Sequence, residues 1–250
     1  MPDLAVVFAT LPQYLATAAV LILAQVVYLV FGFGAGLMAL GLLVLVLPGP
    51  QDIVVILLLV SLPVELAIIL SHRKEIRWQQ ISLVVAGIVI GVPIGTFLLT
   101  RGDPRAVLTV LVVLLALVGL AFLVHPRRVR VRWPRWSAAP VGMLSGLLFG
   151  LLGSGGPPVV FFYQLQGLDK TTFRNHLIAI FFLVSVIRIV SYSVSGLITS
   201  PRLVSALAVL PAVFFGAWLG NRIHLGLPPF MFRRLLGALF LILGLSLLLR

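Results

Sequence analysis

Residues 53–70 read IVVILLLVSLPVELAIIL, a stretch of eighteen residues in which Glu65 is the only charge. A helix needs roughly 20 apolar residues to cross a bilayer, and this stretch with its flanks meets that length. Four further runs have the same character, namely Ile81–Thr100, Ala106–Val124, Phe173–Val194 and Leu203–Leu219. They lack the period-two alternation of membrane β-strands. The sequence therefore predicts an all-α polytopic membrane protein.

The composition of the whole chain agrees with this class. Hydrophobic residues make up 61% of the 250 residues and charged residues only 10%, which is too little polar surface to cover a soluble domain. The formal net charge is +12, but the basic residues sit in short loops between apolar runs, as the positive-inside rule describes. We therefore expect the lipid bilayer as a partner and no nucleic acid.

The N-terminus bears on where the protein resides, and the absence of cysteine bears on which chemistry it can perform. The start, Met1-Pro2-Asp3, has no basic n-region, so we expect no cleavable signal peptide and a multi-pass protein of the cell (inner) membrane. Without cysteine, disulfides, thiolate catalysis and Cys-ligated metals are excluded. The oligomeric state stays open, and a homo-oligomer is one alternative.

A basic stretch divides the chain into two similar halves. The expected parts are a first transmembrane repeat over 1–124, a basic cytoplasmic linker over 125–137 and a second transmembrane repeat over 138–250. At a shift of 125, the halves pair Gly91 with Gly216, Gly95 with Gly220, Pro104 with Pro229 and Gly119 with Gly244. At a shift of 121, Gly32 pairs with Gly153 and Gly34 with Gly155. Internal repeats are a common plan for transporters, with the site at the repeat interface.

Each half opens with an apolar segment that glycine interrupts, at Gly32–Gly36 and at Gly153–Pro158. Glycine costs about 1 kcal/mol against alanine inside a helix, and proline removes a hydrogen-bond donor. If both segments cross the membrane, ten basic residues fall inside and seven outside, whereas two re-entrant hairpins divide them thirteen to four. The positive-inside rule favours the hairpins. We therefore expect two inverted repeats, each a helical hairpin followed by three transmembrane helices.

Two charges fall inside the predicted spans, Glu65 and Arg188. A charge near the bilayer centre is costly and by default marks function. The repeat shift maps Glu65 to within a residue or two of Arg188, which places both near the pseudo-twofold axis. Ser185 and Tyr192 share a helical face with Arg188. These side chains form a candidate substrate site, with Glu65 as charge partner; a purely structural ion pair is the alternative interpretation.

The glycine breaks are the second part of the candidate site. Helix ends that meet near the midplane present N–H groups and positive dipole ends to an anion. The predicted substrate-binding residues of the breaks are Gly32, Gly34, Gly36, Gly153, Ser154, Gly155 and Gly156. The alternative is that these glycines only let helices pack closely.

Other chemistry has little support in the sequence. Gly32-x-Gly34-x-Gly36 lacks the strand–turn–helix setting and the acidic residue of a dinucleotide site, so no cofactor is expected. No His, Asp and Glu cluster has metal-ligand spacing. A minor alternative to transport is an intramembrane serine hydrolase that uses Ser154 and His176, but we expect no enzyme.

The chain resembles the TauE/SafE family of sulfite and organosulfonate exporters. The resemblance rests on Gly32–Gly36, on Gly150–Gly156, on the loop His72–Trp78 and on the Gly-x-x-x-Gly pairs in each half. It implies export of a small anion, most readily sulfite or a sulfoacetate-like organosulfonate. Arg188 suits such a ligand because a guanidinium binds oxyanions with two parallel hydrogen bonds. The alternative is a transporter of another small solute or cation that uses Glu65.

Overall fold

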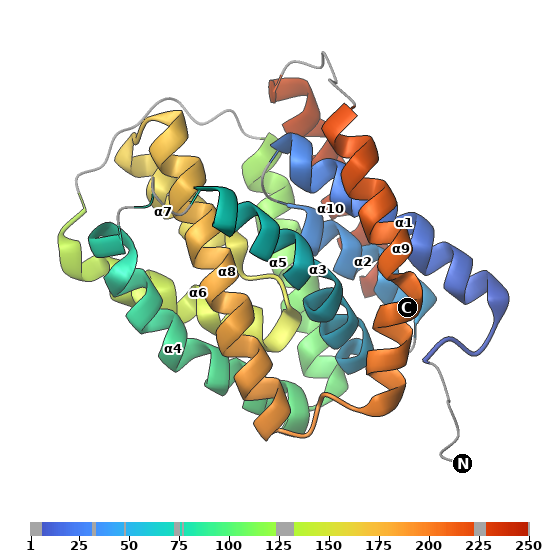
Figure 1. Cartoon of the computed structure of the whole chain (residues 1–250). Helices are drawn as coiled ribbons and strands as arrows, with labels where there is room; N and C mark the ends of the chain where they lie inside the picture. Colours follow the sequence, from blue (N-terminus) through green and yellow to red (C-terminus); the bar gives the residue numbers. More distant parts are fainter. Residues whose placement is uncertain are drawn as a thin grey trace. The chain divides into compact units, whose positions relative to one another are not determined.

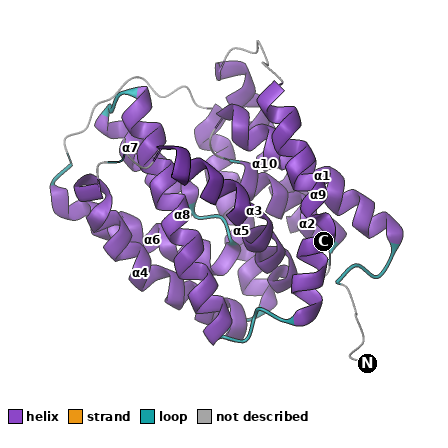
Figure 2. Ribbon diagram, viewed as in Figure 1, coloured by secondary structure: helices purple, strands orange, loops and turns teal. Residues whose placement is uncertain are grey.

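The computed structural model describes residues 7–31, 34–47, 49–72, 76, 78–123, 133–222 and 229–249. This described part is almost entirely helical and contains no strand (Figure 2). In chain order the elements are α1 (Leu11–Phe31), α2 (Ala35–Val46), α3 (Pro50–His72), α4 (Trp78–Arg101), α5 (Pro104–Leu123), the 3-10 turn η2 (Arg135–Ser137), α6 (Ala138–Leu152), α7 (Gly156–Gln166), α8 (Lys170–Val194), α9 (Ser200–Arg222) and α10 (Pro229–Leu248). The all-α class is confirmed.

Seven helical stretches of the described residues are long and apolar enough to cross a membrane. They are Leu11–Leu29, Pro50–Leu70, Trp78–Arg101, Pro104–Leu123, Arg135–Leu152, Thr171–Val194 and Ser200–Arg222. In contrast, α2 and α7 have only 12 and 11 residues, about 18 and 16 Å against a hydrocarbon core of about 30 Å. Because α1 and α6, the first arms of the two expected hairpins, are among the seven, the re-entrant arrangement stays a prediction.

The helix bounds follow both sequence shifts. α5 and α10 begin and end 125 residues apart, at Pro104 and Pro229 and at Leu123 and Leu248. α1 and α6 end 121 residues apart, and α2 and α7 begin 121 residues apart. Helix boundaries of the two halves thus agree at the same offsets as their glycines and prolines.

The chain folds into two compact units that combine segments of both halves. Unit 1 comprises Met1–Ile56, Gly102–Arg127 and Ser200–Arg250, and unit 2 comprises Leu57–Arg101 and Arg128–Thr199. Helix α3 contributes its first turns to unit 1 and the rest to unit 2. The spatial units therefore cut across the predicted repeats 1–124 and 138–250, whose homology stays a prediction.

In unit 2, α4 packs along α6 (Figure 1). A Cβ on Gly91 of α4 would lie 2.7 Å from the Leu147 nitrogen and closer still to the Met143 carbonyl oxygen. Gly87 and Gly95, one turn before and after, meet the α6 backbone in the same way. Small residues on one face thus bring two helix backbones together. Membrane helices associate through such close packing, because lipid tails are as apolar as the side chains and no hydrophobic effect drives the helices together.

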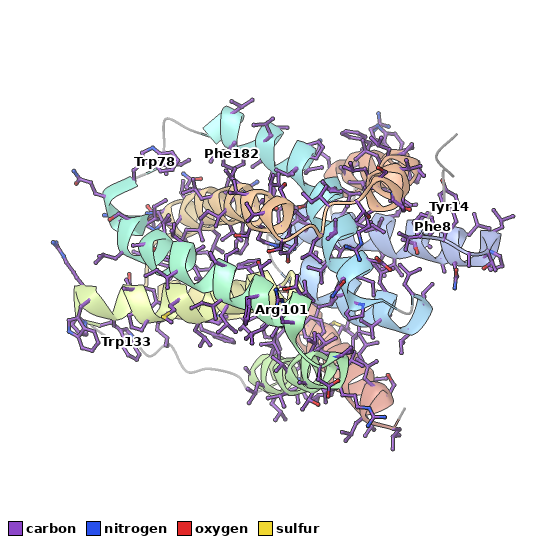
Figure 3. The ribbon with its side chains drawn as sticks, turned by 90° about the horizontal axis from the view of Figure 1, so that it is seen from below. Phe8, Tyr14, Trp78, Arg101, Trp133 and Phe182 are labelled. Atoms are coloured by element: carbon purple, nitrogen blue, oxygen red, sulfur yellow. The ribbon has the colours of Figure 1, made fainter. Side chains whose placement is uncertain are left out.

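Unit 2 has one end at which several segments meet. Ala138 at the start of α6, Gln166 at the end of α7 and Gln79 near the start of α4 line one pocket. Trp78 and Trp133 also lie at this end, and Arg101 lies at the opposite end of α4 (Figure 3). Helices α6 and α7 therefore form a hairpin whose two open ends lie together.

Unit 1 contains the corresponding pairs. α1 packs against α9, the pair that the predicted repeat aligns with α6 and α4, and α5 packs against α10. The side chain of Gln13 near the start of α1 donates to the Val46 carbonyl oxygen at 3.5 Å, at the end of α2, so this hairpin also has its open ends together. The starts of α3 and α9 are joined by an ion pair, 2.6 Å between Arg202 Nε and Asp52 Oδ1.

Candidate functional site

The candidate site lies in unit 2 on α8. This helix begins after Asp169, whose carboxylate accepts a hydrogen bond from the Thr172 N–H at 2.9 Å. Hydrogen bonds from the backbone and side chain of Thr172 lower the pKa of Asp169. Further along, Ser185, Arg188 and Tyr192 lie three and four residues apart and are all buried, with 3, 3 and 0% of their surface exposed. The expected common face of these three residues is thus buried in the protein.

Arg188 and Tyr192 form a hydrogen-bonded pair. Arg188 Nε and Nη2 donate to the Tyr192 hydroxyl oxygen at 3.4 and 3.3 Å, and the guanidinium carbon lies 5.1 Å from the centre of the tyrosine ring. The Tyr192 hydroxyl lies 2.9 Å from the carbonyl oxygen of Gly150 and 3.3 Å from that of Phe149. Since a hydroxyl has one proton, it donates chiefly to Gly150. The guanidinium is thereby linked to the C-terminal, negative end of α6.

Glu65 of α3 joins this cluster. The hydroxyl groups of Ser185 and Ser61 and the charge of Arg188 act on its carboxylate, while the Ser61 hydroxyl donates to the Leu58 carbonyl oxygen at 3.1 Å. Within the described residues its Oε2 atom is buried and accepts no hydrogen bond. Pro63, two residues earlier, removes one backbone donor from α3. The charge of Arg188 thus reaches Glu65 from the other half of the chain, and their pairing at a substrate site stays a prediction.

Some members of the cluster were not predicted. The carbonyl groups of Phe149 and Gly150 are backbone atoms, and nothing in the side-chain pattern marks them; the only signal is the helix end that a following glycine imposes. Ser61 has the i, i+4 spacing to Glu65, which could have indicated it. The cluster as a whole presents one guanidinium, one carboxylate and several hydroxyl groups, which is a set suited to hold a small polar solute.

The glycine break between α6 and α7 is closely packed. Gly153 ends α6 with φ of 67°, a conformation that glycine adopts without steric cost. A Cβ on Gly155, however, would lie 2.7 Å from the Phe149 nitrogen and closer to the Ser145 carbonyl oxygen, and the Ser145 hydroxyl donates to the Gly155 carbonyl oxygen. Gly155 therefore packs against α6, in line with the alternative interpretation of these glycines, and its use by a ligand stays a prediction.

The start of α7 also offers fewer donors than expected. Pro157 and Pro158 occupy the first turn and have no N–H group. Gly156 keeps its N–H, and a Cβ there would meet only the Phe181 ring at 3.4 Å. Ser154 is buried, with 7% of its surface exposed. An anion near this helix end could therefore use Gly156 but not a full turn of amides.

The first glycine break belongs to unit 1. Gly34 precedes α2 with φ of 87°, and Gly36 lies in the first turn, which contains no proline. Gly32 lies outside the described residues. The start of α2 thus retains N–H groups that helix geometry leaves unsatisfied, and their use by a ligand stays a prediction.

The structure separates Ser154 from His176. His176 lines the same pocket as Ala138, whereas Ser154 lies beyond the other end of α6, at Leu152. The 15 residues of α6 span about 21 Å at 1.5 Å per residue. A serine nucleophile needs a base within hydrogen-bond reach, so this pair cannot act as a dyad. Among the described residues, no group of three His, Asp or Glu could hold a metal ion.

Comparison with known proteins places this arrangement in a family. A family model described as "Sulfite exporter TauE/SafE" matches residues 17–247. The chain belongs to the TauE/SafE family. The probable inner membrane transporter protein TsaS of Comamonas testosteroni is 27% identical over 175 residues, which cover 70% of this chain and 73% of that protein. The probable sulfite/organosulfonate exporter TauE of Cupriavidus necator is 27% identical over 225 residues, 88% of either chain. No solved structure gives a significant match.

The TauE/SafE match confirms the resemblance drawn from the glycine segments. Together with the seven apolar helices, it makes this chain a multi-pass membrane transporter of the cell membrane. A low identity to the relatives does not carry their substrates over, because specificity depends on individual side chains of the site.

Proposed function

We propose that this transporter exports small anions, sulfite or organosulfonates, and that Arg188 is the positive group of the substrate site. The observation that carries the proposal is the burial of the Arg188 side chain, 3% exposed, in a helix that can span the membrane. A charge held at such a depth costs several kcal/mol. A structural pair can be replaced by apolar residues with little loss, so a ligand that needs the charge explains it better.

The surroundings of Arg188 support this role. Tyr192 fixes the guanidinium from one side through Nε and Nη2, and a fixed fork loses little entropy on binding an oxyanion. We expect Glu65, on which the charge of Arg188 acts, to hold the arginine in place or to take up a coupling proton. Exit of a monovalent anion from a negative interior is favoured by about 2.3 kcal/mol per 100 mV.

A second candidate function uses Glu65 as the ligand for a cation or neutral solute. The buried Oε2 atom that accepts no hydrogen bond from the described residues favours it, because an unsatisfied carboxylate oxygen attracts a proton or cation. A ligand panel separates the two candidates. Sulfite, sulfoacetate, taurine, sulfate and chloride are added to the purified protein, and only ligands of the folded state raise its thermal stability.

The double variant Arg188→Leu with Glu65→Leu tests the role of the charge. Removing both partners avoids the penalty of one uncompensated buried charge. We expect a folded protein that neither transports anions in proteoliposomes nor responds to them in the thermal assay. Arg188→Lys serves as the matched variant and should lose most transport, because an ammonium cannot form the bidentate fork. An active, ligand-responsive double variant would show that the pair is only structural.

We further propose that α6 and α7 form a re-entrant hairpin in an inverted repeat. The shared pocket at the start of α6 and the end of α7 and the thirteen-to-four division of basic residues support it. The chain has no cysteine, so single cysteines introduced at Arg135, Lys170 and Ser200 report sidedness directly. We expect the first two to be labelled from the cytoplasm and the third from outside. Labelling of the cysteines at positions 135 and 170 from opposite faces would contradict the re-entrant hairpin.

A further inference from the structure

The pocket at the end of unit 2 has not been given a role above. Its volume is about 610 Å³, and it lies among the starts of α4 and α6, the end of α7 and the first turns of α8. Ligand pockets commonly measure about 300–1,000 Å³. Since a water molecule occupies about 30 Å³ of liquid, a bare oxyanion would leave most of this volume to water. The size therefore favours an organic ligand over an inorganic ion.

Four rings form a row in the wall of the pocket. The ring centres of Trp133 and Phe162 are 6.4 Å apart, those of Phe162 and Tyr163 5.3 Å, and those of Tyr163 and His176 5.1 Å. Tyr163 and His176 are 98 and 99% buried, with 2 and 1% exposed, and the Tyr163 hydroxyl donates to the Gln80 carbonyl oxygen at 3.3 Å. The row is thus held by packing and by a hydrogen bond to α4. Trp133, with 45% of its surface exposed, is the member of the row that a ligand can reach, and aromatic rings pair favourably in offset or edge-to-face contact.

The polar groups of the pocket give it a positive charge. Arg135 lines it, and no carboxylate is among the lining residues that the structure describes. The side-chain amides of Gln79, Gln80 and Gln166 add donors and acceptors. A guanidinium with neutral amides around it attracts an anion and disfavours a cation.

We propose that this pocket is a second anion site, which binds organic anions that carry a carboxylate or sulfonate on a planar aromatic ring. The ring packs against Trp133, the exposed member of the row, which the buried rings of Phe162, Tyr163 and His176 support, and the anionic group pairs with Arg135. The site is separate from the one at Arg188, because His176 and Arg188 are twelve positions apart on α8, about 18 Å along the helix. Binding at this pocket does not depend on the proposed transport function.

The test measures binding of benzenesulfonate and benzoate to the purified full chain. Methanesulfonate keeps the charge without the ring, and benzenesulfonamide keeps the ring without the charge. We expect both aromatic anions to bind at least about tenfold more tightly than either of these two, the effect of a charge-assisted hydrogen bond and of ring contact together. Methanesulfonate or benzenesulfonamide binding as tightly as benzenesulfonate would overturn the proposal.

Two variants place the binding in this pocket. Arg135→Gln should weaken benzenesulfonate by about tenfold and leave benzenesulfonamide unchanged, whereas Arg101→Gln, at the far end of α4, should change neither. Phe162→Leu should weaken both ligands and leave methanesulfonate unchanged. Equal effects of Arg135→Gln and Arg101→Gln would overturn the assignment. Size-exclusion profiles confirm that each variant is folded.

A lipid could supply similar chemistry, so the test includes one. A short-chain phosphatidylglycerol should displace benzenesulfonate less effectively than benzoate does; more effective displacement would make the pocket a lipid site and overturn the proposal. The double variant Arg188→Leu with Glu65→Leu should still bind benzenesulfonate. Binding that fails there but survives in Arg135→Gln would place the anion at Arg188 instead.

Discussion

The contact between α4 and α6 permits a sharp test by a single methyl group. In Gly91→Ala the new Cβ would lie 2.7 Å from the Leu147 nitrogen and 3.0 Å from the Met143 carbonyl carbon, where ordinary contacts begin at about 3.4 Å. Backbone atoms of a helix cannot turn aside as a side chain can. The two helices must therefore separate, and the neighbouring glycine contacts one turn away on each side must open with them.

The cost of this change follows from two opposing effects. Overpacking of a close-packed interface costs about 1–3 kcal/mol, occasionally more. Alanine in place of glycine returns about 1 kcal/mol of helix propensity. Because the obstacle at Gly91 is backbone, we take the upper part of the first range, about 2–3 kcal/mol, and after the helix-propensity gain expect a net destabilisation of about 1–2 kcal/mol.

The matched control is Gly244→Ala in α10. Its new Cβ would lie 3.6 Å from the nearest atoms, in ordinary contact, so this variant should be neutral or more stable by up to about 1 kcal/mol. Thermal unfolding of both variants in detergent, followed by fluorescence-detected size exclusion, gives the comparison. Equal melting temperatures for the two variants would refute the close approach of α4 and α6.

Three further predictions concern the site and unit 1. Tyr192→Phe removes the hydroxyl that accepts from Arg188 and donates to an α6 carbonyl oxygen. It should lower the free energy of unfolding by about 1–2 kcal/mol and reduce the thermal stabilisation by anions; an unchanged stabilisation would mean that the hydroxyl does not position Arg188. Gly155→Ala should lower thermal stability because its Cβ meets the α6 backbone, whereas Gly156→Ala should be tolerated; the reverse order would contradict the hairpin packing. Arg202→Gln should cost about 0.5–1 kcal/mol, and the loss should shrink in high salt; an effect that does not change with salt in the unfolding assay would speak against the ion pair.

The membrane class and the polar cluster of α8 could be read from the sequence. Apolar runs such as 53–70 recur along a chain that is only 10% charged, and a soluble protein of this size lacks the polar surface to cover them all. The spacing of Ser185, Arg188 and Tyr192 is local, because helix geometry alone sets which residues share a face. The expectation that Glu65 lies near Arg188 came from aligning the glycines and prolines of the two halves, a comparison that carries long-range information within a single sequence.

Only the tertiary structure decided which neighbour each glycine faces. Gly155 and Gly156 are adjacent in the sequence, yet a Cβ on the first meets the backbone of α6 and one on the second meets only a phenyl ring. The structure also paired α4 with α6 and α1 with α9, and so formed compact units from both halves of the chain. Hydropathy measures how apolar a helix is and leaves its partner open, because one apolar face fits lipid and another helix nearly equally well. Partner choice depends on close backbone approach, which exists only once both helices are in place.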